Sequence, residues 1–379
     1  MTASEAAVQA RPAGSRSAGR AIVFGAVLVT VLGLLFGLPW FTLVLAPGWP
    51  VTLTTTGTLV FAAAAVALPV LMFLGHGRGR DWASRIGDTT LGVIWVLFVW
   101  SLLGNVVRLF GVDARPTAIG VTAVCAILVV WGYAEAMRVP RIKRVDVTMP
   151  RLGKGLDGLR VALITDTHYG PIDRARWSGR VIDAVNELDA DIVCHTGDIA
   201  DGTVEQRLAQ AAPLGRARAR LARAYVTGNH EHFGAAQAWV EHMGELGWET
   251  LENRHTVVER GGDRLVLAGV SDATTRYSIE SALSGTDPHL PVLLLAHQPK
   301  QVTAAVAAGV DLQLSGHTHG GQIWPFNLLV RIDQPVVSGL SKHGERTQLY
   351  TSNGTGFWGP PLRVFAPSEI TMITLRAAA

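Results

Sequence analysis

The first third of the chain is dominated by long apolar runs that carry no charged side chain. These runs are residues 21–46, 51–75, 89–107 and 117–134, and short polar or basic stretches separate them. An α-helix rises about 1.5 Å per residue, so a run of about 20 residues can cross the hydrocarbon core of a bilayer. The pattern therefore predicts four transmembrane helices. Because the runs contain no ionisable residue, they favour a membrane anchor over a transport pathway.

Basic residues are distributed unequally between the two ends of these predicted helices. Four spans place the N-terminal tail, the loop between the second and third helices and the exit from the fourth helix on one side. That side carries ten basic residues, whereas the other side carries only Arg108 and Arg115. Since cytoplasmic loops are enriched in Lys and Arg, we expect a multi-pass cell-membrane protein whose tail and C-terminal domain face the cytoplasm. The ten residues are Arg11, Arg16, Arg20, Arg78, Arg80, Arg85, Arg138, Arg141, Lys143 and Arg144.

The remainder of the chain alternates between strand and helix patterns. Amphipathic stretches predict helices at residues 174–188, 207–223, 235–246 and 301–308. Short strands separated by turns follow from about residue 335 and end at 370–375. Such alternation is typical of an α/β domain. The earlier predicted strands are residues 159–164, 191–196, 224–227, 264–270, 291–296 and 310–315.

These patterns divide the chain into four parts. Residues 1–20 show no periodicity and predict a disordered tail, and residues 21–137 hold the four predicted transmembrane helices. Residues 138–158 form a basic connector that contains Pro and Gly, and residues 159–379 form the α/β domain.

Composition agrees with this division. The chain has 379 residues, of which 49% are hydrophobic, and its formal net charge of +3 is too small to indicate a nucleic-acid partner. The two cysteines, Cys125 and Cys194, lie in different predicted domains, so we expect two small buried residues rather than a disulfide. Of the twelve histidines only His76 precedes residue 150, so the chemistry is expected in the C-terminal part.

Metal-type ligands directly follow five predicted strands of the α/β domain. In open α/β sheets, ligands bind beyond the carboxyl ends of the strands, so we expect these side chains to form one convergent site. In an extended chain, residues two apart point to the same side, which places His317 and His319 together. In chain order the strand ends carry Asp166 and His168, Asp198, Asn229 with His230 and Glu231, His297, and finally His317 and His319.

The types of ligand indicate paired divalent ions. Carboxylate, amide oxygen and imidazole suit Mn, Fe, Zn or Co, and the lack of thiolates argues against a structural zinc site or an iron–sulfur cluster. The candidate ligands are too many for one ion and suit two ions that share a carboxylate. A centre with two metal ions can clamp a phosphoryl group and hold a hydroxide nucleophile.

The ordered motifs resemble those of the calcineurin-like metallophosphoesterase superfamily. The blocks D-x-H, G-D, G-N-H-E, H and G-H-x-H occur in the family's order, and residues 159–375 are covered by the resemblance. It implies an α/β fold, a four-layer αββα sandwich, preceded here by the all-α module of four transmembrane helices. Residues 317–322 and 357–361 are also similar to one branch, the membrane-associated bacterial phosphodiesterases related to the UDP-diacylglucosamine pyrophosphohydrolases.

The resemblance implies a role for each candidate residue. His230 would contact the phosphate and protonate the leaving oxygen after in-line attack by a hydroxide that bridges two divalent ions. Asp198 would bridge both ions. Apart from the resemblance, we expect Glu231 to orient the loop, or His230, through a hydrogen bond. The other implied ligands are Asp166, His168 and His319 for the first metal, and Asn229, His297 and His317 for the second.

Other polar residues have simpler interpretations. His195 lies on a strand body and is expected to be structural, and His232 is expected in a solvated loop. The remaining histidines of the domain, which lack a motif, are expected at the surface; they are His242, His255, His289 and His343. A solvated helix face, with contact to anionic lipid as the alternative, is expected for Arg216, Arg218, Arg220 and Arg223.

These observations favour a membrane-anchored phosphohydrolase that cleaves a phosphodiester or pyrophosphate bond of a lipid-linked substrate. The expected partners are a phospholipid membrane and a phosphate ester. Two alternatives are kept. One is the same chemistry on a soluble nucleotide-type phosphodiester, and the other is a membrane sensor with a structural metal site, against which the presence of His230 argues. The pattern leaves the oligomeric state open.

Overall fold

The computed structural model describes residues 14–234 and 236–378. Four of its helical segments are long and apolar enough to cross a membrane, as the sequence predicts: Gly25–Leu45, Val51–Gly77, Asp81–Arg108 and Ala114–Met137. They correspond to α1 (Gly14–Trp40) with the π-helical turn η1 (Phe41–Leu45), α2 (Val51–Met72) with η2 (Phe73–Gly77), α3 (Asp81–Arg108) and α4 (Ala114–Met137).

Two of these helices extend beyond their apolar runs. Residues 1–13 of the predicted tail lie outside the described residues, but residues 14–20 belong to α1, so the prediction of disorder is wrong there. Helix α3 begins at Asp81, although the uncharged run begins at residue 89. Helical hydrogen bonds do not depend on apolar side chains, so hydropathy alone misplaces the N-terminal ends of α1 and α3.

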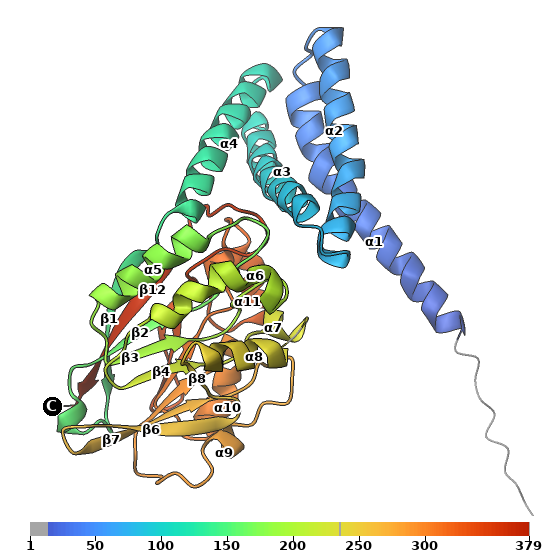
Figure 1. The fold of residues 1–379 in the computed structure, drawn as a ribbon. Helices are drawn as coiled ribbons and strands as arrows, with labels where there is room; N and C mark the ends of the chain where they lie inside the picture. The colour runs from blue at the N-terminus through green and yellow to red at the C-terminus, as the bar shows by residue number, and fades with distance from the viewer. Residues whose placement is uncertain (1–13, 235, 379) are drawn as a thin grey trace, which may run out of the picture. The chain divides into compact units, whose positions relative to one another are not determined.

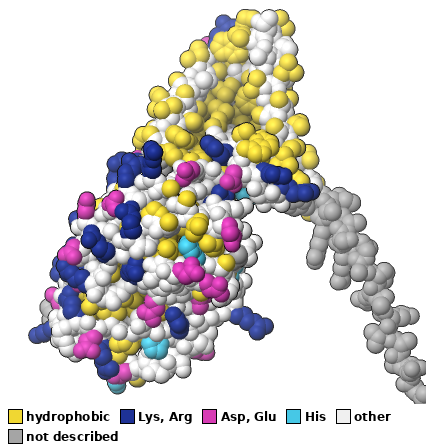
Figure 2. Space-filling model, in the orientation of Figure 1, with side chains coloured by type: hydrophobic (Ala, Val, Ile, Leu, Met, Phe, Trp, Pro, Cys, Tyr) yellow, Lys and Arg dark blue, Asp and Glu magenta, His cyan; other side chains and the backbone are white. Residues whose placement is uncertain are grey.

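The chain separates into two compact units, residues 1–67 with 94–125 and residues 68–93 with 126–379. In the first unit a few polar bonds link the helices. Asn105 Nδ2 donates to Thr42 Oγ1 at 2.6 Å, and Trp40 Nε1 donates to Thr58 Oγ1 at 3.0 Å. Hydrophobic side chains cover the helices in Figure 2, whereas charged groups of both signs lie on the visible face of the C-terminal domain.

The second unit contains two six-stranded sheets (Figure 1). The first has the order β1 (Arg141–Met149), β12 (Glu369–Ala377), β2 (Leu159–Ile164), β3 (Ile192–His195), β4 (Ala222–Tyr225), β5 (Glu249–Thr250). The second has the order β10 (Gly339–His343), β11 (Thr347–Thr351), β9 (Leu312–Ser315), β8 (Val292–Leu295), β7 (Asp263–Gly269), β6 (Arg254–Arg260). Strands β2, β3 and β4 are parallel, and so are β7, β8 and β9.

The two sheets pack face to face, and helices cover their outer faces. Leu163 and Cys194 of the first sheet share one buried cluster with Leu293 and Leu314 of the second. Helices α5 (Ala175–Glu187), α6 (Val204–Ala211) and α8 (Ala236–Glu245) cover the first sheet, and α9 (Ile279–Ala282) and α10 (Val302–Ala307) cover the second (Figure 1). This arrangement is the predicted α/β fold with an αββα sandwich, and both cysteines are buried and free as expected.

Three local expectations are wrong. The stretch 138–158 is more than a connector, because residues 141–149 form β1 and pair with β12 along its whole length. The helix expected at 207–223 ends at Ala211 and continues only as a 3₁₀ turn, η4 (Ala212–Arg216), since Pro213 cannot continue the α-helical bonding. The arginines that follow therefore lie on a loop and on β4. His242 is buried in α8 rather than at the surface.

Candidate metal centre

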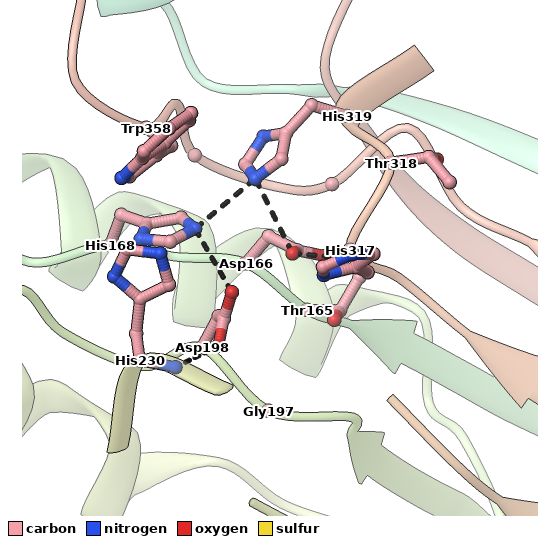
Figure 3. A network of polar contacts seen from close by, with 12 residues as sticks. Thr165, Asp166, His168, Gly197, Asp198, His230, His317, Thr318, His319 and Trp358 are labelled. Atoms are coloured by element: carbon pink, nitrogen blue, oxygen red, sulfur yellow. Dashed lines mark hydrogen bonds and ion pairs between the residues drawn. The ribbon is translucent and has the colours of Figure 1, made fainter. Parts of the chain in front are cut away.

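The structure brings all eight predicted site residues to one end of both sheets. The candidates after β2 and β3 come from the first sheet, and those after β8 and β9 come from the second. Figure 3 shows the side chains of Asp166, His168, Asp198, His230, His317 and His319 gathered in one place. Asn229 and His230 begin the single turn α7 (Asn229–His232) after β4. The converging side chains are those of Asp166, His168, Asp198, Asn229, His230, His297, His317 and His319.

Seven of these residues form overlapping groups that can hold a metal ion. In each group one ligand atom per residue lies within 4.8 Å of the others. His168 belongs to two groups, and so does Asp198, which is the residue expected to bridge. The groups are Asp166 with His168 and His319, His168 with Asp198 and His230, and Asp198 with His297 and His317. Asn229 completes the set, with its Oδ1 3.2 Å from Nε2 of His297.

Hydrogen bonds orient two of the imidazoles for metal binding. Nδ1 of His297 lies 2.7 Å from the carbonyl oxygen of Thr196, and Nδ1 of His168 lies 3.1 Å from Oδ1 of Asp201. A proton held at Nδ1 leaves the Nε2 lone pair free for a metal, which is the usual arrangement of metal-binding histidines. In both residues Nε2 faces Asp198 Oδ2, at 3.2 Å and 3.5 Å. The donor set therefore fits divalent ions.

The backbone at the centre adopts unusual conformations. Positive φ angles, rare outside glycine, occur at Asp166 (53°), His168 (42°), Asp198 (55°), His317 (70°) and His319 (52°). Such conformations cost free energy and persist only where the surroundings fix them, so they concentrate at functional sites. Here they let each short turn after a strand present its ligand inward. The carboxylate of Asp166 helps to fix one turn by accepting the His317 backbone N–H at 2.9 Å.

Glu231 holds two of the ligand loops together. Its carboxylate accepts backbone N–H groups from Asp198 at 2.9 Å, Ile199 at 2.7 Å and Gly228 at 2.7 Å. The side chain is 1% exposed. Of the two expected roles for Glu231, the geometry corresponds to orienting the loop.

His230 lies at the edge of the centre beside an acidic partner. Its Nδ1 is 2.6 Å from Oδ1 of Asp201, and its ring packs edge-on against Trp358 with 5.7 Å between ring centroids (Figure 3). Burial by itself lowers the pKa of His230. The negative charges of Asp198 and Asp201 and the hydrogen bond to Asp201 outweigh burial and raise that pKa to about 9. The acidic neighbours of His230 therefore favour its protonated, imidazolium form.

A loop at residues 353–366 supports the centre through Arg363. This fully buried arginine donates from Nε to the carbonyl oxygen of Gly356 at 2.9 Å and from Nη1 to that of His319 at 3.2 Å. Its backbone N–H donates to the carbonyl oxygen of Gly132 in α4 at 2.9 Å. The loop thus contacts both the candidate ligand His319 and the last turns of α4.

Sequence reasoning missed several residues that contact the centre. Asp201 bonds two histidines of the site, yet a single aspartate three residues after Asp198 carries no signal of its own. Trp358 lies within the predicted motif at 357–361 and Arg363 lies two residues after it, but nothing in that pattern assigns them a contact. His195 is fully buried, and its Nδ1 accepts the Gly197 N–H at 3.2 Å, as expected for a structural histidine.

The chain belongs to the calcineurin-like metallophosphoesterases. A family model described as calcineurin-like phosphoesterase matches residues 159–321. The predicted superfamily is thereby confirmed, and the protein is a metal-dependent phosphoesterase. The resemblance to the narrower branch of UDP-diacylglucosamine pyrophosphohydrolases stays a prediction.

Two relatives are similar to much of this chain. A Danio rerio protein named transmembrane protein with metallophosphoesterase domain is 32% identical over 362 residues, which are 88% of this chain and 83% of that protein. An uncharacterized metallophosphoesterase of Helicobacter pylori is 36% identical over 251 residues, 64% of this chain and 66% of its own length. The four apolar helices and the first relative together indicate a membrane protein.

The domain also overlaps solved structures. The 5′-nucleotidase precursor of Thermus thermophilus overlaps 57% of this chain and 54% of its own with a TM-score of 0.37 and 16% identity. Similarity at this level bears on neither the activity nor the substrate of the present chain.

Proposed function

We propose that this protein hydrolyses a phosphodiester or pyrophosphate bond of a lipid-linked substrate at a centre of two divalent ions. The observation that carries the proposal is the convergence of buried carboxylates and oriented imidazoles beside His230, a group that a purely structural metal site does not need. The ligand assignment is the one implied by the family. Asp166, His168 and His319 would hold one ion, Asn229, His297 and His317 would hold the other, and Asp198 would contribute to both.

Each residue then has a distinct task. Bound Mn, Fe, Zn or Co would supply a water-derived nucleophile at neutral pH and neutralise charge on the phosphoryl oxygens. His230 donates its proton to the leaving oxygen, and Asp201 keeps His230 charged and correctly turned for that transfer. Glu231 fixes the loop that carries Asp198, so the ligand geometry is set before substrate arrives.

Contacts within the second unit support a substrate that comes from the membrane. Phe365, 58% exposed, lies against Trp131 of α4 with 5.5 Å between ring centroids. Helix α11 (Asn327–Asp333), shortly after the G-H-x-H motif, exposes Leu328 and Ile332 at 57% and 82%. Apolar surface beside the site suits an amphiphilic substrate better than a soluble nucleotide, because its lipid chains need an apolar environment.

The location of the protein is part of the proposal. We assign residues 21–137 to the membrane anchor and residues 159–379 to the phosphoesterase domain, with the strand-forming stretch between them. The excess of basic residues on one side favours a cell membrane with the domain in the cytoplasm.

Hydrolysis by detergent-solubilised protein tests the chemistry. With Mn, Zn or Mg, bis-p-nitrophenyl phosphate should be hydrolysed, and EDTA should abolish turnover. Vesicle-embedded lipids with phosphodiester or diphosphate head groups should then react faster than their water-soluble head groups alone. Equal rates on the lipid and the soluble compound would favour the soluble-substrate alternative. A protein that binds metal but hydrolyses none of these compounds would contradict the proposed function.

A further inference from the structure

A hollow beside the metal centre contains a buried arginine with incomplete hydrogen bonding. Of the candidate ligands only His168 lines the hollow, which therefore lies beside the metal groups rather than over them. Loop 170–174 and the loop at 357–361 form two of its walls. The lining residues that matter here are Arg85, Asp88, His168, Arg174, Asp201 and Phe357.

Arg174 carries two buried guanidinium nitrogens without a hydrogen-bond partner in the described part of the chain. The side chain is 4% exposed, and its Nη1 donates to the carbonyl oxygen of Thr167 at 3.3 Å. The other two nitrogens, Nε and Nη2, have no hydrogen-bond partner among the described residues. These two N–H groups lie side by side on the planar guanidinium and form the fork that binds carboxylate or phosphate through two parallel hydrogen bonds.

Aromatic rings hold this unpartnered fork in place. The guanidinium carbon of Arg174 lies 3.5 Å from the ring centroid of Trp177 and 4.5 Å from that of Phe357. The group therefore cannot swing into water, although a buried donor without a partner is destabilising. Burial lowers the pKa of Arg174 to about 9, as expected for a guanidinium separated from water.

The acidic groups of the hollow are engaged with other partners. Asp201 faces His168 and His230, and Oδ1 of Asp88 lies 2.8 Å from Nε2 of His76. Each carboxylate is thus already paired with a histidine through its Oδ1, and neither forms an ion pair with Arg174 within the residues that the structure describes. Arg85 is exposed and adds a second positive charge to the lining of the hollow.

Arg363 shows what a structural arginine looks like in this fold. It is equally buried, but each of its nitrogens donates to a carbonyl oxygen: Nε to Gly356, Nη1 to Ala366 and Nη2 to Asn353, at 2.8–2.9 Å. The unpartnered Nε and Nη2 of Arg174 therefore indicate a partner from outside the chain. Two parallel N–H groups of a guanidinium can each bind one oxygen of a carboxylate or phosphate, so we expect this partner to be an anion.

We propose that Arg174 binds a second anionic group of the substrate, a phosphoryl or carboxylate group carried next to the phosphoryl group that is cleaved. The inference rests on the proposed function, because it assigns a binding site for part of the same substrate. It makes Arg174 a specificity-determining residue that favours substrates with two neighbouring anions over simple phosphodiesters.

Calorimetric titration of the full-length, Mn-loaded protein in detergent tests this inference without turnover. The probes are methylphosphonate, which has one anionic group, and phosphonoacetate, which adds a carboxylate. The wild type should bind phosphonoacetate about tenfold or more tightly than methylphosphonate, since a hydrogen-bonded charge contributes about 1.5–3 kcal/mol. Arg174→Met should abolish this preference and leave methylphosphonate binding within about twofold. Phosphonoacetate binds free Mn to the same extent with every variant, so the difference in affinity between variants reports the contribution of Arg174.

Two further variants complete the test. Arg174→Lys keeps the charge without the fork, so it should retain only part of the preference, and it replaces Arg174→Met if that variant does not fold. Arg223→Met is the matched control, because Arg223 also stacks on a tryptophan, Trp248 at 5.9 Å, and donates to the carbonyl oxygen of Ala217 at 3.0 Å. An unchanged preference in Arg174→Met, or no preference in the wild type, overturns the inference. If the wild type shows the preference but does not hydrolyse bis-p-nitrophenyl phosphate, the proposed function is contradicted and the assignment of Arg174 as an anion-binding residue is not.

Discussion

One carboxylate oxygen of Asp201 lies 2.6 Å from Nδ1 of His230 and 3.1 Å from Nδ1 of His168. A single acidic side chain therefore joins the proposed proton donor to a candidate metal ligand. Removing its charge should affect both the acid–base behaviour of the site and the orientation of His168, and the two effects can be separated by measuring rates at saturating metal.

Replacing Asp201 should move the alkaline limit of activity. The pKa of His230 is raised to about 9, so the proton donor is charged below that pH and loses its proton above it. Asp201→Asn removes one of the charges that raise this pKa, and the alkaline limb of kcat/KM should move to lower pH by about 1 to 3 pH units. The measurement is a pH–rate profile with bis-p-nitrophenyl phosphate at saturating Mn. A limb that stays in place would show that His230 is not the group that titrates.

Removing His230 should slow the chemical step without emptying the site. His230→Ala should lower kcat by about 10² to 10⁴ for a poor, alkyl leaving group. The loss should be smaller for p-nitrophenolate, which leaves without a proton. Metal content, measured by mass spectrometry, should stay within error of the wild type.

His232→Ala is the matched control for this comparison. His232 lies two residues further along α7 and bonds Thr227 Oγ1 at 2.9 Å. Its replacement should leave unchanged the ratio of the kcat values for the alkyl and the p-nitrophenolate leaving groups. Equal losses for both leaving groups in His230→Ala would argue against a proton donor.

A methyl group at Gly316 should disrupt a ligand. A Cβ at this position would overlap the carboxylate of Asp166 and the hydroxyl of Thr165. Gly316→Ala should therefore destabilise the fold by about 1–3 kcal/mol and weaken metal binding. By contrast, a Cβ at Gly244 in α8 meets nothing within 4 Å, so Gly244→Ala should stabilise the protein by up to about 1 kcal/mol. The midpoint of thermal unfolding, measured with and without Mn, checks both variants. Equal midpoints for Gly316→Ala and Gly244→Ala would contradict the predicted overlap.

Metal removal should destabilise the domain as well as stop turnover. Asp166 and Asp198 are 0% and 2% exposed, so bound cations would neutralise charges that water cannot reach. EDTA should lower the midpoint of thermal unfolding, and added Mn should restore it. Asp198→Ala should remove most of this shift because Asp198 belongs to two of the three ligand groups. Asp183 forms an exposed ion pair with Arg216, so Asp183→Ala should keep the full Mn-dependent shift of the unfolding midpoint. A smaller shift in this variant would argue against metal binding by Asp198 as the cause.

The sequence predicts the chemistry of the site better than its geometry. Strand-end positions of Asp166, Asp198 and His297 follow from periodicity and from the rule that parallel strands present ligands at their carboxyl ends. The positive φ angles of His317 and His319 follow neither from periodicity nor from this rule. Those conformations depend on tertiary contacts, such as the bond from His317 N–H to Asp166, which no local pattern encodes.

The failures have similar causes. Asp201, Arg174 and Arg363 each contact at least one group distant in the chain, namely His230, Phe357 and His319, and no local pattern encodes these contacts. Strand β1 escapes prediction because its edge position leaves much of it exposed and rich in Lys and Arg, and those residues indicate a connector. The predicted helix at 207–223 extends too far because its charged residues fit helical periodicity beyond Pro213.

Strand β1 begins four residues after α4 ends and pairs with β12 from Arg141↔Glu369 to Met149↔Ala377. The stretch that leaves the last apolar helix is thus also the edge of a sheet. A protease that cut within residues 141–149 would not release an intact enzyme, because β12 would keep its pairing with β2 but lose its partner on the other edge. An exchange of the helices for another anchor would have to join the chain before Arg141. The protein can thus lose or change its anchor only at a junction of a few residues, which ties the evolution of the anchor to that of the fold.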